Sequence, residues 1–203
     1  MNLASEAQHQ HLPLPELEDS ALLEKIAKQQ SRDALAVLYE RYRLSVSSFL
    51  RRKLIAEKLV EEIYNDVMYT VWSRASEFRH DSKVSTWIYG IAYRHCMAQS
   101  RKETRHSRQR ATLDFDQEID PATSSAKFEL QQLLQKAIAG LSEEHRTVIE
   151  LAYFYGHNIE DISKIVDCPT NTVKTRLYHA RQKLKTLIRT QNPTVNTVSL
   201  GGS

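Results

Sequence analysis

The sequence is poor in residues that interrupt regular structure: its 203 residues include only five glycines and five prolines. Sheets and their hairpins need more turn residues than this, so we expect an all-helical protein. No apolar run reaches the length of about eighteen residues that a membrane span requires, and the N-terminus lacks the apolar core of a signal peptide. We therefore expect a cytoplasmic protein without direct membrane insertion.

Clusters of reactive side chains are scarce as well. Cys96 and Cys168 lie far apart in unrelated patterns, which supports neither a disulfide framework nor a zinc site. His9 and His11 have no third ligand nearby, so a metal-dependent enzyme built on the histidines is a remote alternative. The sequence contains no catalytic triad with supporting context and no phosphate-binding glycine loop. We expect no catalytic residue, no metal and no cofactor, hence a protein that is not an enzyme.

Charge is distributed unevenly although the net charge is only +3. Residues 101–110 hold five basic residues and one acid, whereas residues 114–120 hold four acids and no base. Such a reversal of sign favours specific partners over general solubility.

Apolar residues recur at helical spacing before residue 105 and again after residue 127, with linker-like sequence between. Two helical domains joined by a charged linker are therefore expected. Asp19 or Ser20 is the predicted N-cap of the first helix, and Thr170 or Asn171 that of the last. The predicted boundaries are a disordered segment (1–18), a first domain (19–104), a linker (105–126), a second domain (127–189) and a disordered tail (190–203).

The second domain ends in two helical patterns that meet at a tight connection, Asp167-Cys168-Pro169. The longer, second pattern has an apolar stripe and a basic opposite face, which together are typical of a helix-turn-helix that binds DNA. A helical hairpin with a solvated basic face is the plainer alternative. The basic face comprises Lys174, Arg176, His179, Arg181 and Lys183.

Two features of the first domain allow similar alternatives. One side of its third predicted helix is an acidic face, which is either merely exposed or docks on a basic protein surface: Glu61, Glu62, Asn65 and Asp66. The segment Phe78 to Ser85 breaks the helical pattern, and the helix expected from Thr86 begins with aromatics, among them Trp87. These aromatic residues either pack inward or stack bases, a contact that contributes roughly 1–3 kcal/mol per base.

These blocks together resemble the sigma-70 family of bacterial RNA polymerase sigma factors, in the two-domain extracytoplasmic-function (ECF) group. The first matching block contains DALAVLYERY and EEIYNDVMYTVWSRASEFRHDSKVSTWIYGIAYRHCMAQSRK. The second is AGLSEEHRTVIELAYFYGHNIEDISKIVDCPTNTVKTRLYHARQKLK. The resemblance implies an alternative sigma factor that binds the beta and beta-prime subunits of core RNA polymerase, recognises −35 and −10 promoter DNA and promotes melting. It also implies an anti-sigma factor as a partner.

The resemblance assigns a role to each candidate residue. The acidic face defined above would bind core polymerase, and the acidic segment 114–120 would enter a basic channel of the polymerase. The −10 element would be bound as single strand by Phe78, Arg79, His80, Lys83, Trp87, Tyr93 and Arg94. The −35 major groove would be read by Asn171, Thr172, Lys174, Thr175, Arg176 and His179.

The sequence departs from the family pattern at several of these positions. Leu59 stands where the acidic cluster usually begins, and Gly90 stands where the −10 helix usually has arginine. Asp167 replaces the usual turn glycine, but aspartate tolerates the left-handed conformation better than most residues, so we expect the turn to form. A stand-alone helix-turn-helix regulator and an interaction protein that mimics a sigma factor are the rival hypotheses.

Overall fold

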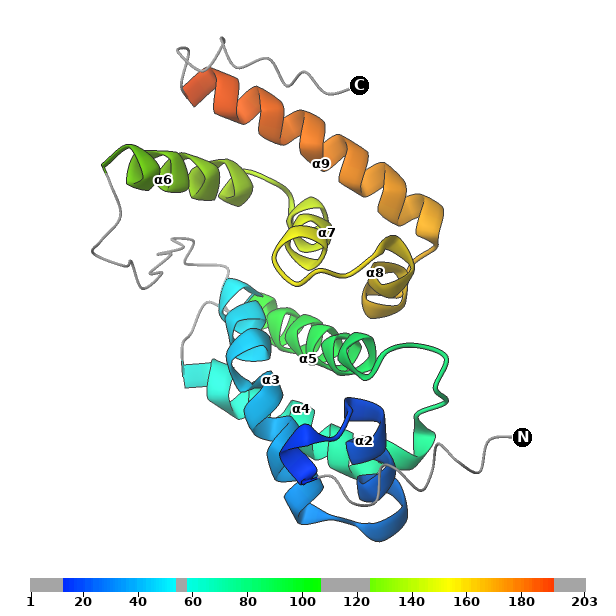
Figure 1. Ribbon diagram of the computed structural model, residues 1–203. Helices are drawn as coiled ribbons and strands as arrows, with labels where there is room; N and C mark the ends of the chain where they lie inside the picture. The colour runs from blue at the N-terminus through cyan, green and yellow to red at the C-terminus, as the bar shows by residue number, and fades with distance from the viewer. Residues whose placement is uncertain (1–12, 54–57, 107–124, 192–203) are drawn as a thin grey trace. The chain divides into compact units, whose positions relative to one another are not determined.

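The computed structural model describes residues 13–53, 58–106 and 125–191, and every regular element in these ranges is a helix, as expected. The described chain divides into two compact units (Figure 1): the first contains the elements up to α5, and the second contains α6, α7, α9 and residues 159–163 of α8. None of these helices combines the length and apolar character that a membrane span requires. The elements are η1 (Leu14–Glu16), α2 (Asp19–Gln29), α3 (Arg32–Lys53), α4 (Lys58–Arg74), η2 (Ala75–Glu77), α5 (Val84–His106), α6 (Ser125–Ala139), α7 (Glu143–Tyr153), α8 (Ile159–Val166) and α9 (Thr170–Gln191).

The first unit is organised around α3, which packs against α2, α4 and α5. Each helix contributes its apolar stripe, and Leu38, Val67 and Ile88 are completely buried. Tyr64 is buried as well, and its hydroxyl donates a 2.5 Å hydrogen bond to the Tyr39 carbonyl. Burial raises the pKa of Tyr64, so its hydroxyl stays a donor and fixes α4 to α3.

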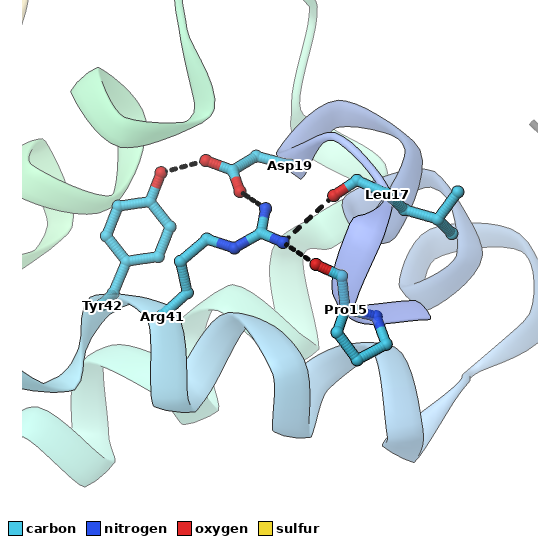
Figure 2. A network of polar contacts seen from close by, with 5 residues as sticks. All are labelled: Pro15, Leu17, Asp19, Arg41 and Tyr42. Carbon is cyan, nitrogen blue, oxygen red and sulfur yellow. Dashed lines mark hydrogen bonds and ion pairs between the residues drawn. The ribbon is translucent and has the colours of Figure 1, made fainter. Parts of the chain in front are cut away.

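A polar network fastens the start of the chain to α3 (Figure 2). Arg41 forms an ion pair with Asp19 and donates hydrogen bonds to the carbonyls of Pro15 (2.9 Å) and Leu17 (3.1 Å). Tyr42 donates to the other oxygen of the Asp19 carboxylate, and burial raises the pKa of Tyr42. The predicted capping role of Asp19 is therefore wrong. The N-cap position is Glu18, and the Asp19 carboxylate binds α3 instead.

Replacing Arg41 by alanine is expected to lower the free energy of unfolding of the first unit by about 1–2 kcal/mol. The variant removes the hydrogen bonds to two carbonyls and leaves the partly buried Asp19 carboxylate with Tyr42 as its remaining donor in this network. Both tryptophans of the sequence, Trp72 and Trp87, belong to this unit, so urea titration followed by tryptophan fluorescence measures its unfolding selectively. Arg43→Ala is the matched control, because the ion pair of Arg43 among the described residues is an exposed one of 3.4 Å with Glu40. Equal losses in the two variants would contradict the role of the network.

The second unit is built around α9, which packs against α6 and α7. The predicted apolar stripe of α9 is confirmed where Val173, Leu177 and Ala180 are buried. Gly140 follows the end of α6, and Gly156 follows α7 with φ of +69°, a conformation that favours glycine.

The structure moves several predicted boundaries. The first predicted segment is not disordered throughout, because Leu14–Glu16 forms η1 and Leu17 is buried. The loop that follows η2 is shorter than expected, since α5 begins at Val84 rather than at residue 86. Thr170 is the first residue of α9, so Thr170 and Asn171 lie inside this helix and not at the predicted N-cap position before it. Helices α5 and α6 extend into the predicted linker, and the histidines 9 and 11 and the acidic segment 114–120 lie outside the described residues.

Candidate polymerase and nucleic-acid interfaces

The acidic face is displayed on α4, opposite the side chains that this helix buries. Glu61, Glu62, Asn65 and Asp66 are all exposed, whereas Ile63 is buried. Asn65 accepts a 2.9 Å hydrogen bond from the Tyr39 hydroxyl, which fixes one end of the face to α3. The four polar residues thus form one continuous exposed patch on a helix held firmly from behind. Leu59 is half-buried beside this patch.

The loop before α5 is anchored by Phe78, which is only 9% exposed. Its ring centroid lies 5.5 Å from that of Trp87 and 4.8 Å from that of His80. Aromatic contacts at these distances hold the loop against α5. Because its ring is used inside the protein, Phe78 does not project as a surface for DNA. The neighbouring predicted residues Arg79, His80 and Lys83 are exposed.

A cavity of about 560 Å³ opens between α4 and α5. It brings together two predicted residues, Trp87 and Arg94, whereas Tyr93 does not line it. The other walls could not be predicted from the sequence around Trp87, because side chains of α4 reach the cavity from a different part of the chain. These additional lining residues include Tyr69, Thr70, Arg74, Ile91 and His95.

Aromatic rings and arginines line this cavity together. Tyr69 is 71% exposed and Trp87 is half-buried, so two ring surfaces are accessible to a ligand. Arg74 and Arg94 add positive charge to the wall, with Glu77 as a single opposing acid. This combination suits a nucleotide, whose base stacks on aromatic rings and whose phosphate attracts guanidinium groups.

His95 forms part of the cavity wall, with Nε2 3.1 Å from the Thr70 hydroxyl. Burial lowers the pKa of His95, the Arg94 charge lowers it further, and Asp66 partly offsets these effects. The folded protein therefore favours the neutral imidazole. The hydrogen bond of His95 to Thr70 joins α5 to α4, which is consistent with a structural role for His95.

The lowered pKa of His95 predicts a first unit that is less stable in mild acid. The unfolded chain takes up a proton near pH 6.5 whereas the folded protein resists it until a lower pH, so stability is lost as pH falls below about 6.5. We expect the fluorescence-detected melting temperature to fall more between pH 7.5 and pH 5.5 for the wild type than for His95→Asn. Equal decreases would refute the contribution of His95.

The connection between α8 and α9 forms the tight turn predicted for a helix-turn-helix. Asp167 has φ of 51°, which confirms the expectation that aspartate adopts the left-handed conformation here. Ser163 donates a 2.5 Å hydrogen bond to the Cys168 carbonyl, and the Cys168 N–H donates to the Ser163 carbonyl at 3.1 Å. At the other end of α8, Asn158 Oδ1 accepts from the Asp161 N–H at 2.8 Å, a cap that the sequence analysis did not assign.

The predicted DNA-reading residues differ in their accessibility on α9. Thr172 is half-buried and Arg176 is held by neighbouring groups, with a 3.0 Å ion pair to Glu144 and a 3.8 Å contact from Nη1 to the Cys168 sulfur. Thr175 donates its hydroxyl to the Asn171 carbonyl at 2.9 Å. The residues of the set that are exposed are Asn171, Lys174, Thr175 and His179.

Metal ligands are not gathered anywhere in the described ranges, where no group of three or more histidine, cysteine or acidic residues is placed to hold an ion. The accessible features are instead an acidic helix face, an aromatic and basic cavity and a helix with exposed polar residues after a tight turn. The fold and these surfaces define an all-helical helix-turn-helix protein of two units.

Comparisons with known proteins identify the family. The family described as "Sigma-70 region 2" matches residues 38–106, and "Sigma-70, region 4" matches residues 131–184. The "ECF RNA polymerase sigma factor RpoE" of Cereibacter sphaeroides is 30% identical, with 81% of this chain and 92% of the relative covered. The "ECF RNA polymerase sigma-E factor" of Escherichia coli strain K12 is 29% identical, with coverage of 86% and 98%.

A solved structure shows the same fold at lower sequence similarity. It is the sigma factor RpoE in complex with the anti-sigma factor NepR from Bartonella quintana, with a TM-score of 0.60 and 23% identity. The likeness covers 76% of this chain and 98% of that chain. The chain belongs to the ECF family of RNA polymerase sigma factors. It is an alternative sigma factor that directs promoter-specific initiation of transcription.

Proposed function

We propose that the sigma factor binds core RNA polymerase through the acidic face of α4. The contact residues are Glu61, Glu62, Asn65 and Asp66. Their exposure and the buried opposite side of the helix support this role, because a partner can reach the carboxylates without disturbing the core. The polymerase surface that receives them is basic, since opposite potentials steer association and fix the register of a complex.

The cavity between α4 and α5 supports binding of an unpaired −10 strand. Trp87 supplies a ring for stacking, Arg94 supplies a charge inside the cavity, and the exposed Arg79, His80 and Lys83 extend the basic surface. Phe78 contributes indirectly, because its buried ring holds the loop against Trp87. Stacking contributes roughly 1–3 kcal/mol per base, which is comparable with the cost of opening one step of duplex DNA.

Reading of the −35 element is assigned to α9, which follows the tight turn as recognition helices do. Exposed polar side chains reach the groove from the first turns of the helix, and Arg176 adds a guanidinium held in place. Replacing Arg176 by alanine is expected to weaken promoter binding by about 1–3 kcal/mol, the range for a specific base contact. The proposed set is Asn171, Thr172, Lys174, Thr175, Arg176 and His179.

The domain roles follow from these assignments. Residues 19–104 form the polymerase-binding and −10 domain, and residues 127–189 form the −35 domain. We place the protein in the cytoplasm with RNA polymerase, as a regulator rather than an enzyme, and expect an anti-sigma factor to restrain it. The solved complex of a sigma factor with its anti-sigma factor NepR supports the last point.

One observation carries the function: a single chain joins an acidic helix and an aromatic, basic cavity to a helix-turn-helix. A stand-alone DNA-binding regulator needs only the second unit, and a sigma mimic would bind a regulator but not DNA. Purified protein should therefore be added to core polymerase and transcription measured from a genomic promoter library. Stimulation at a distinct set of promoters is expected. No stimulation at any promoter would refute the proposal.

A further inference from the structure

Within the described residues, Arg176 is the member of the proposed −35 set that forms an ion pair with a carboxylate. Its Nη2 lies 3.0 Å from Oε2 of Glu144, and its Nη1 donates to the Cys168 sulfur at 3.8 Å. The two holding groups come from different places: Glu144 from the first turn of α7, and Cys168 from the turn before α9. The side chain of Arg176 is 24% exposed, so this arrangement is only partly open to solvent.

The contacts of Arg176 within the described residues use only part of its donor capacity. A guanidinium has five N–H groups, and the two contacts use one on each terminal nitrogen. The Nε–H and one N–H on each terminal nitrogen have no partner in these ranges. Because the group is planar, fixing two of its hydrogens also fixes the plane in which the other three point.

The carboxylate that holds Arg176 has a favourable position on its own helix. Glu144 lies in the first turn of α7, where the helix dipole favours a carboxylate. Its side chain is 65% exposed, and an ion pair this accessible contributes little to folding. The consequence of the pair is therefore the orientation of Arg176 rather than the stability of the unit.

Orientation distinguishes a base from a phosphate. The two acceptors on a guanine edge require a guanidinium in a defined plane, whereas phosphates are contacted from many directions along the backbone. Released from its carboxylate, Arg176 would sample several rotamers and pair with any nearby phosphate. Glu144 also lowers the positive charge of this face, which disfavours sequence-independent binding.

We propose that Glu144 is a positioning residue that gives α9 its sequence specificity by orienting Arg176 for a base edge. This inference rests on the proposed reading of −35 DNA by α9 and identifies a determinant outside that helix. Removal of the carboxylate should leave affinity for DNA in general intact or higher, while discrimination between sequences declines. A residue that only supported the fold would lower both.

The test uses holoenzyme assembled from the full chain and core polymerase. Two duplexes serve as probes: one carries a −35 element mapped by the promoter-library experiment, and the other has that element scrambled. The measured quantity is a ratio: the dissociation constant for the scrambled duplex divided by that for the duplex with the −35 element. For Glu144→Gln we expect this ratio to fall about fivefold or more, with binding to the scrambled duplex unchanged or tighter. Glu160→Gln removes one exposed carboxylate from α8 and should leave the ratio unchanged.

A double-mutant cycle separates positioning from other effects. In an Arg176→Ala background, Glu144→Gln should cause no further change in the ratio, because the group that it positions is gone. Circular dichroism melting of each variant, compared with that of the wild type, checks that the substitution does not unfold the protein. A ratio for Glu144→Gln equal to that of the wild type, or an equal fall with and without Arg176, would overturn the inference. If the wild-type holoenzyme itself does not distinguish the two duplexes, the proposed −35 function fails and this inference fails with it.

Discussion

Reversing two charges on the acidic face, Glu62→Lys together with Asp66→Lys, is expected to weaken binding to core polymerase at least about 100-fold. Each lysine would place a positive charge against a basic partner surface, and like charges at an interface cost several kcal/mol. A 100-fold weaker complex corresponds to about 2.8 kcal/mol, which is within that range. The measurement is the dissociation constant of the complex between fluorescently labelled sigma factor and core polymerase.

The fold should tolerate this double substitution. Glu62 and Asp66 are exposed on one side of α4 and are four residues apart, so the helix exchanges one like-charge pair for another. Lysine is also a good helix former. The unfolding free energy of the first unit is therefore expected to change by no more than about 0.5 kcal/mol, as is usual for surface substitutions.

A control must reproduce the change in net charge at another place. Glu24→Lys with Glu40→Lys alters two exposed carboxylates on α2 and α3, whose ion pairs within the described residues are solvent-exposed. This variant should bind core polymerase within about threefold of the wild type, because its charges lie outside the proposed contact and exposed pairs contribute little. Comparable weakening by both variants would show that net charge, rather than the face of α4, controls binding.

Patterns of spacing predicted the helices well because burial of an apolar stripe is a local property of the sequence. Leu38 and Val46 in α3 and Val173 and Leu177 in α9 are buried as their three- and four-residue spacing indicates. The same reasoning placed Glu62 and its neighbours on an exposed side. A helix with one apolar side has one way to face a core, so these features follow without knowledge of the partners.

Contacts between distant parts of the chain were not predictable in this way. Aspartate is a residue type that often caps helices, but the carboxylate of Asp19 binds Arg41, 22 residues along the chain. Arg176 belongs to an exposed basic pattern, but it pairs with Glu144 from another helix. In each case the local sequence allowed two roles for the side chain. The partner that decides between these roles is brought near by the fold and is not specified by neighbouring residues.

Phe78 and Trp87 show the same difficulty at the proposed −10 site. Phe78 belongs to a segment without helical periodicity and Trp87 to the first turn of the helix expected after it, so spacing gives no clear indication of which ring faces inward. The structure buries Phe78 and leaves Trp87 half-buried beside the cavity. Their rings are in contact, with centroids 5.5 Å apart. Replacing each residue by alanine is nevertheless expected to affect a different property of the protein.

Phe78→Ala is expected to destabilise the first unit by about 3–5 kcal/mol, as removal of a buried aromatic ring usually does. Trp87→Ala should cost less stability, because part of its ring is already in water. Trp72 remains in both variants and reports unfolding in urea. A larger loss for Trp87→Ala than for Phe78→Ala would show that the tryptophan, not the phenylalanine, anchors the loop.

Promoter opening should instead depend on Trp87, with initiation by the Trp87→Ala holoenzyme reduced about 5- to 150-fold through loss of 1–3 kcal/mol of base stacking. Trp87→Phe keeps an aromatic face and should retain most activity. Permanganate reactivity of thymines in the −10 element measures opening directly, under conditions where the variant is folded. The defect should become smaller on a template mismatched across the −10 element, because those base pairs need not be broken. A folded Trp87→Ala variant that opens matched duplex as well as the wild type would exclude Trp87 from strand capture and leave it a role in packing alone.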